Sequence, residues 1–143
     1  MRFIKSREGN FRKYLKRHFD LTLPEGVDLF YAKGVRVGND ELRKSQIHGE
    51  LGYAACDFGF NPTNALIQNF GHLAKRNVLR LKPEAALEFA EGMDLKMDLG
   101  KSTKHMIVCF KSYVLGLGYY DAKKQTVVNK IPKKRRRKII NSI

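Results

Sequence analysis

The side chains best suited to binding chemistry stand near the C-terminus, in a dense run of cations. Residues 130–138 hold seven basic residues and no acid, and Pro132 precedes six consecutive cations, Lys133 to Lys138. The proline ring ends the strand that we expect before it and directs the chain outward as a tail. Arginine can bind phosphate oxygens through two parallel hydrogen bonds, and lysine adds compact positive charge. The run favours a polyanion as ligand; a nuclear-localisation signal and a solvated tail are the alternatives.

The formal charge of the whole chain is concentrated at its two ends. The 143 residues carry 28 Lys and Arg against 14 Asp and Glu, a net charge of +14. Residues 1–17 contribute +6 and residues 130–138 contribute +7, so the remainder is nearly neutral at +1. Neutralising phosphates with cations releases counterions, which supplies most sequence-independent affinity for nucleic acids. We predict that both basic ends converge on one groove that binds an RNA backbone.

Residue types that carry catalysis are scattered along the chain. The sequence lacks a glycine-rich phosphate loop, an HExxH zinc motif and a GxSxG nucleophile motif. Asp94 and Asp98 stand four apart on an expected strand, where that spacing only places both on one face. For a small enzyme acting on nucleotides or RNA we can nominate only His72, His105 and Asp57, which would have to share one pocket. We therefore predict no catalytic residue, no metal and no cofactor.

The cysteines and the lack of long apolar segments indicate in which cellular compartment the protein works. Cys56 and Cys109 each lie in an apolar stretch, which predicts small buried side chains, with a disulfide between them the less expected alternative. They form no CxxC pair, and four scattered histidines do not complete a zinc site. The first ten residues lack the apolar core of a signal peptide, and no run approaches the roughly 18 apolar residues of a membrane span. We expect a soluble, cytoplasmic protein with no membrane partner.

The hydrophobic pattern predicts a compact, barrel-like α+β protein. Phe11, Tyr14, Leu15 and Phe19 recur at offsets of three and four, which indicates an amphipathic helix over residues 6–19. Asn61 is the expected N-cap of a second helix, with Pro62 in its first turn. The other expected elements are strands at 27–32, 34–37, 78–81, 93–97, 106–113, 114–119 and 126–131, a helical turn at 40–44, a bent strand within 47–59, and helices at 62–70 and 83–91.

Five short motifs follow one another in a recognisable order. They are Gly49-Glu50-Leu51-Gly52, Phe60-Asn61-Pro62-Thr63-Asn64-Ala65-Leu66, Leu81-Lys82-Pro83-Glu84-Ala85-Ala86 running to Gly92, Leu115-Gly116-Leu117-Gly118, and Asn129-Lys130-Ile131-Pro132-Lys133-Lys134-Arg135-Arg136. The series resembles the RNA-binding PUA-like domain that follows the catalytic domain in RNA cytosine-5 methyltransferases of the Nol/Nop/Sun family. The resemblance covers residues 49–137. It departs at Tyr119-Tyr120, where the family tends to have lysine, and the methyltransferase catalytic domain with its cysteines is missing.

The resemblance implies a mostly antiparallel PUA-like β pseudo-barrel with short helices over residues 46–143, preceded by an N-terminal helix and strands over residues 1–45. It implies a stand-alone module that binds rRNA or tRNA in RNA modification or ribosome biogenesis. Its partners besides RNA would be an RNA methyltransferase in trans or a ribosome assembly factor. A small enzyme, and a scaffold whose basic tail binds an acidic protein, are the alternatives.

The side chains expected to contact RNA lie in four places: a loop after the second helix, the pair of tyrosines, the end of the last strand and the basic run. Strand alternation puts one of the two tyrosines in the core, and the pattern does not distinguish them. The start of the Pro62 helix belongs to the same expected surface. The residues are Lys75, Arg76, Tyr119, Tyr120, Lys130, Lys133, Lys134, Arg135, Arg136 and Arg137.

Overall fold

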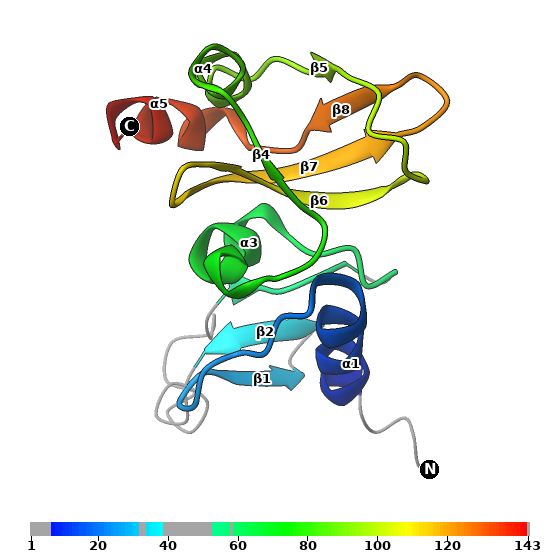
Figure 1. Cartoon of the computed structure of the whole chain (residues 1–143). Coiled ribbons are helices and arrows are strands. Elements are labelled where there is room, and N and C mark those ends of the chain that lie inside the picture. Colours follow the sequence, from blue (N-terminus) through cyan, green and yellow to red (C-terminus); the bar gives the residue numbers. More distant parts are fainter. Residues whose placement is uncertain (1–6, 32–33, 39–52, 58, 143) are drawn as a thin grey trace. The chain divides into compact units, whose positions relative to one another are not determined.

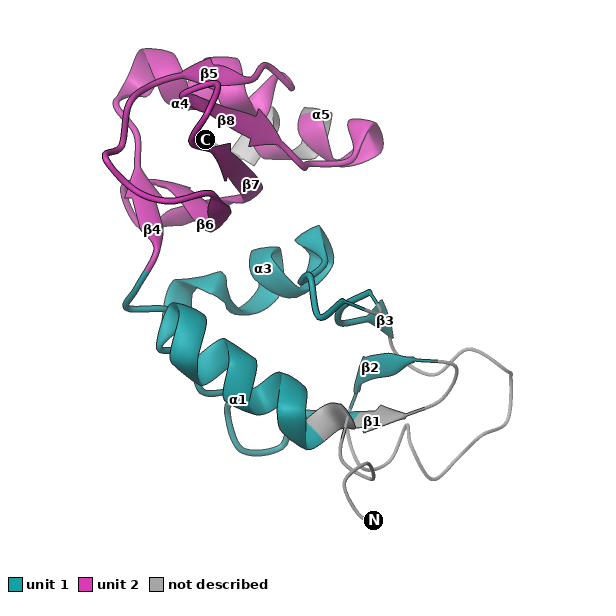
Figure 2. Ribbon diagram, turned by 90° about the vertical axis from the view of Figure 1, so that its right-hand side faces the viewer, with its two compact units in different colours: residues 1–76 teal, residues 77–143 magenta. Residues whose placement is uncertain are grey.

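The structure, a computed structural model, describes residues 7–31, 34–38, 53–57 and 59–142 (Figure 1). The chain divides into two compact units, Met1–Arg76 and Asn77–Ile143 (Figure 2). The boundary that we expected between residues 45 and 46 lies outside the described residues, so that division stays a prediction. The expected helical turn at 40–44 and the first glycine motif lie outside them too. Each unit is described by itself.

The first unit is built on an amphipathic helix and a small antiparallel sheet. Helix α1 (Arg7–Phe19) buries Phe11, Leu15 and Phe19 completely, as the spacing of its apolar residues predicted. Strands β1 (Asp28–Tyr31), β2 (Val35–Gly38) and β3 (Tyr53–Ala54) form a sheet in the order β1-β2-β3, with antiparallel pairing throughout. The alternation of buried and half-buried residues along β2 shows that one face of the sheet is covered.

Helix α3 (Asn64–Phe70) begins later than the sequence suggested. Its N-cap is Thr63, whose hydroxyl accepts a hydrogen bond from the Leu66 N–H at 3.2 Å, so the predicted cap at Asn61 is wrong. The reason is Asp57: its carboxylate accepts hydrogen bonds from the backbone and side-chain N–H groups of Asn61 and closes a turn there. A short 3₁₀ helix, η2 (Gly71–Leu73), follows.

The second unit confirms the α+β prediction with a curled, five-stranded half-barrel sheet. Its strand order is β4-β6-β7-β8-β5, and only β4 and β6 are parallel. Helix α4 contacts β5, β6, β7 and the C-terminal helix α5 (Figure 1). The bounds are β4 (Val78–Arg80), α4 (Pro83–Ala90), β5 (Leu95–Lys96), β6 (Lys104–Phe110), β7 (Tyr113–Asp121), β8 (Thr126–Asn129) and α5 (Lys133–Ser142).

The core of the second unit lies between one face of this sheet and helix α4. Phe89 on α4 and Tyr120 on β7 are its largest buried side chains. Gly118 lets the layers close: a Cβ there would lie 2.9 Å from Val127 Cγ1 and 3.0 Å from Val108 Cγ2. The second glycine of the Leu-Gly-x-Gly motif is therefore required by close packing in the core. The cluster comprises Leu81, Ala86, Phe89, Leu95, Met106, Val108, Leu115, Tyr120, Val127 and Ile131.

Candidate nucleic-acid interface

The motif Asn129-x-x-Pro132 forms a junction that fixes where the basic run starts. The Asn129 side-chain amide donates hydrogen bonds to Phe89 O at 2.6 Å and to Met93 O at 3.1 Å. It therefore provides hydrogen-bond donors to carbonyls at and just beyond the C-terminal end of α4. Its own side-chain oxygen accepts from the Ile131 N–H at 2.9 Å. The Asp94 carboxylate accepts from the Asn129 N–H at 2.8 Å. Four contacts at one residue hold the last strand against the helix, and the basic run leaves from this fixed point.

The basic run is helical in α5, so the outward tail that we expected from Pro132 onward is wrong. Lysine and arginine are good helix formers, and the carbonyl of Pro132 accepts from the Arg135 N–H at 2.9 Å as α5 begins. Ile139 is partly buried and packs against the core cluster, so α5 is docked by its apolar side. We did not predict this docking, because the few apolar residues that follow the six cations, beginning with Ile139 and Ile140, form too short a pattern to indicate a helix face.

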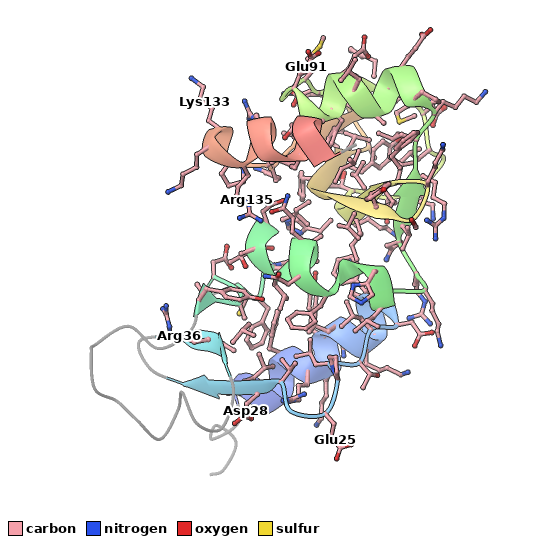
Figure 3. The ribbon with its side chains drawn as sticks, turned by 90° about the vertical axis from the view of Figure 1, so that its left-hand side faces the viewer. Glu25, Asp28, Arg36, Glu91, Lys133 and Arg135 are labelled. Carbon is pink, nitrogen blue, oxygen red and sulfur yellow. The ribbon has the colours of Figure 1, made fainter. Side chains whose placement is uncertain are left out.

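Three cations of the run occupy the first turn of α5. Lys133, Lys134 and Arg135 are exposed, and the turn holds no acidic residue. The positive end of a helix dipole lies at its N-terminus, where each added cation costs about 0.3–1 kcal/mol. A phosphate group bound at this turn would relieve that repulsion and meet backbone N–H groups as well. The side chains of Lys133 and Arg135 extend outward from α5 (Figure 3).

Arg136 takes a different position from its neighbours. Its Nε donates to Ile131 O at 3.1 Å, and its guanidinium lies against Gly92 at the end of α4. We expected Arg136 among the RNA-binding residues, but one of its five N–H donors bonds within the fold and its guanidinium packs against Gly92. Arg137 also belongs to α5; its side chain lies outside the described residues.

Strand register decides between the two tyrosines. Tyr120 is 1% exposed, belongs to the core, and accepts a hydrogen bond from the Leu99 N–H at 3.0 Å, so we leave it out of the proposed surface. Tyr119 points to the opposite face of the sheet and is only partly buried. The ring of His105 lies 4.9 Å from it, and Lys130 Nζ lies 5.9 Å from its centroid. Together, these three side chains offer a ring and a cation, which suit a nucleobase and a phosphate.

Lys75 and Arg76 belong to the first unit. Their backbone N–H groups donate to Phe19 O at 2.9 and 3.0 Å, and the Arg76 guanidinium donates to Arg17 O. Arg76 therefore satisfies carbonyls at the end of α1, where the helix dipole favours a cation. This structural role was missed because the helix end and Arg76 are far apart in the sequence. Lys75 is exposed.

The side chains nominated for an enzyme are divided between the two units. Asp57 and His72 lie in the first unit and His105 in the second. The Asp57 carboxylate is engaged in its turn, where it also accepts from the Gly59 N–H at 2.8 Å. Within the described part of the chain, no group of three or more His, Cys, Asp or Glu side chains could hold a metal ion.

Both cysteines are buried thiols. Their burial agrees with the sequence prediction, and no disulfide joins them. Burial raises the pKa of the Cys109 thiol, only partly opposed by the Arg80 cation, so the reactive thiolate is disfavoured.

A curled, five-stranded half-barrel sheet with short helices is the architecture of a PUA-like domain, a class of RNA-binding module. Residues 76–137 match the family model of the methyltransferase RsmF PUA domain. The match confirms the resemblance drawn from the motifs, over a shorter range. No methyltransferase catalytic domain is detected in the 143 residues, and no curated protein matches the chain. Among the described residues, no helix has the length and apolar character needed to cross a membrane.

Proposed function

We propose that this protein binds structured RNA, rRNA or tRNA, through the start of α5 and the adjoining Tyr119 and Lys130. The observation that carries the proposal is the cationic first turn of α5, three residues beyond a lysine placed over an aromatic ring. The module contributes binding rather than chemistry. It acts in RNA modification or ribosome biogenesis, alongside an RNA methyltransferase that acts in trans.

Different parts of this surface suit different parts of a nucleotide. Lys133, Lys134 and Arg135 can hold phosphates of a stem or loop, where most protein–RNA affinity arises. Tyr119 can stack on an unpaired base, and Lys130 can pair with the phosphate beside it. A few stacked contacts then select an RNA that phosphate contacts alone would not distinguish.

The charge distribution of the second unit favours the approach of RNA from the side of α5. Residues 77–143 hold fifteen basic and six acidic residues, a net charge of +9. Three of the acids, Glu84, Glu88 and Glu91, are exposed on or just after α4. An RNA strand is attracted to α5 and repelled by that side of α4, so charge orients the docked strand.

A filter-binding comparison tests the proposal. The protein is titrated against a tRNA, an rRNA hairpin and a DNA hairpin of the same length, each with and without excess polyglutamate. We expect the RNAs to bind more tightly, because 2′-hydroxyls add contacts that DNA lacks, and polyglutamate to compete weakly. Binding of polyglutamate in place of RNA would support the acidic-partner alternative, and no RNA binding at low salt would overturn the proposal.

The role beside a methyltransferase has its own test. An RNA cytosine-5 methyltransferase that lacks a PUA domain is assayed at limiting RNA with and without this protein. We expect the protein to raise the methylation rate at low RNA concentration and to leave the rate at saturating RNA unchanged. No effect at any RNA concentration would contradict this role while leaving RNA binding intact.

A further inference from the structure

The first unit contains a groove that neither the motifs nor the family match assigns. It has a volume of about 240 Å³ and lies between α1 and the segment that follows the helix. Leu15, Leu21 and Leu23 line it with apolar surface, and Thr22 adds a hydroxyl. These residues lie outside residues 76–137, the range matched by the PUA family model.

Cations surround this apolar floor on the helix side. Arg12, Lys13 and Lys16 are all exposed and all line the groove. Arg12 and Lys16 are four residues apart, about 6 Å along the helix axis, which is close to the separation of neighbouring phosphates in a nucleic acid strand. Lys13 lies between them in the sequence. The rim therefore presents positive charge at a spacing that a strand can match.

Two of these cations are held in place by carboxylates of the same unit. Lys16 Nζ lies 2.8 Å from Asp20, and Arg12 lies 4.0 Å from Asp28. The hydrogen bond from Lys16 lowers the pKa of Asp20, so its carboxylate stays charged. Exposed pairs of this kind are weak and exchange readily with other anions. Among the described residues, no ion pair engages Lys13.

The size of the groove favours a single nucleotide over a folded protein partner. Pockets for drug-sized ligands measure about 300–1,000 Å³, so a groove of this volume suits one flat ring. A stable protein interface needs roughly 800 Å² from each partner. The three leucines are at most 7% exposed, so most of the accessible apolar surface of the groove comes from the aliphatic stems of Arg12, Lys13 and Lys16. This surface is too small for a large protein partner.

We propose that this α1 groove is a second RNA subsite, which accepts one unpaired base against the aliphatic stems of its lining cations and holds the flanking phosphates with the charged ends of Lys13 and its neighbours. The inference rests on the proposed function, because it assumes that the protein binds RNA. It adds a contact to a single-stranded segment, distinct from the surface on α5.

Photo-crosslinking locates this contact directly. The full chain is irradiated with an oligouridylate of about eight nucleotides that carries one 4-thiouridine, and the crosslinked peptides are identified by mass spectrometry. We expect a crosslink within residues 12–23. Thr22→Glu places a carboxylate in the groove and should reduce the yield roughly tenfold, the loss expected when a charge-assisted contact is removed. Ser102→Glu, the same change in charge at an exposed loop of the second unit, should leave the yield unchanged.

The outcomes separate this inference from the proposed function. Crosslinks confined to the second unit, with binding unchanged in Thr22→Glu, would overturn the groove and leave the proposed function standing. An acidic peptide that binds the wild type, fails to bind Thr22→Glu and excludes the oligonucleotide would assign the groove to a protein instead. The absence of any RNA binding would overturn both.

Discussion

The guanidinium of Arg136 lies against Gly92, across the contact between α5 and the end of α4. A Cβ at Gly92 would lie 2.6 Å from Arg136 Cζ and 2.8 Å from Nε, distances that real Cβ atoms essentially never show, so the guanidinium would have to move away. Gly92 also has a φ of +105°, which L-residues rarely adopt. The basic helix therefore docks where the chain has a glycine, and Arg136 fixes its position.

Gly92→Ala should destabilise the protein for two separable reasons, the backbone conformation and the collision with Arg136. We expect a loss of about 1–3 kcal/mol in the free energy of unfolding, measured in urea. Gly100→Ala is the matched control, because Gly100 has a φ of +64° and a Cβ there would meet nothing within 4 Å. In an Arg136→Ala background the collision disappears, so Gly92→Ala should cost less there. Equal costs in both backgrounds would contradict the contact.

Asn129→Ala should also lower stability, because it removes the junction before the basic run. The change removes the amide donor to Met93 O and the acceptor of the Ile131 N–H, whereas Phe89 O keeps the Gly92 N–H. An unsatisfied group costs about 1–3 kcal/mol. Asn69→Ala is the control, since that exposed amide donates to Tyr53 and Ala65. We expect Asn69→Ala to cost clearly less in the same urea unfolding experiment. A smaller effect at Asn129 than at Asn69 would show that the junction is unimportant.

The two tyrosines should separate binding from stability. Tyr119→Ala should weaken RNA binding by about 1–3 kcal/mol, the range found for loss of one base–aromatic stack, with little change in stability. Tyr120→Phe removes the partner of the Leu99 N–H and should destabilise the fold by about 1 kcal/mol while RNA affinity stays the same. Fluorescence anisotropy and urea unfolding measure the two quantities. The reverse pattern would mean that the opposite face of the sheet meets RNA.

Tyr14 on α1 should make the stability of the first unit sensitive to alkaline pH. Burial raises the pKa of its hydroxyl to about 12, an effect only partly opposed by Arg17. The unfolded tyrosine ionises near pH 10, so this contribution to stability is fully present below pH 10 and is lost as the pH rises toward about 12. We expect the wild type to lose more unfolding free energy between about pH 9 and about pH 11 than Tyr14→Phe does. The exposed Tyr113→Phe is the control, and equal losses in Tyr14→Phe and the wild type would contradict the assignment.

The sequence predicted those helices whose periodicity or capping residues give a clear local signal. The apolar stripe of α1 and the proline and glycine around α4 gave their positions closely. The turn at Lys111-Ser112 was not predicted, because Lys111 is not a typical turn former and adopts a φ of +53° through the pairing of β6 with β7. Helix α5 was not predicted either, because its docking depends on Ile139 and Gly92, which only the folded chain brings to it.

The sequence predicted the chemical character of the candidate site, but not which individual side chains are exposed on it. Composition alone identified the cations, and the motifs identified the domain. Which tyrosine is exposed follows from strand register, and the structural roles of Arg76 and Arg136 depend on carbonyls distant in the sequence. The predicted convergence of both basic ends on one groove stays a prediction, because α1 and α5 belong to different units.

Truncation of the basic run is a poor test of RNA binding, because it would also remove Ile139 from the core and Arg136 from Gly92. Charge substitutions avoid this problem. Lys130, Lys133 and Lys134 are exposed lysines on the proposed surface, and Lys101, Lys123 and Lys124 are exposed lysines in loops of the same unit. The two sets change the charge equally, so they form matched triple alanine variants.

The most direct measurement of the central claim is the salt dependence of RNA affinity for the wild type and these two variants. Each phosphate contact contributes about 0.7–0.9 to the slope of log K against log salt concentration. We predict that the Lys130, Lys133 and Lys134 variant loses roughly two units of slope and binds more weakly at every salt concentration, whereas the loop variant keeps the wild-type slope. Identical slopes for all three proteins, or affinity that does not change with salt, would contradict the claim that this surface binds RNA.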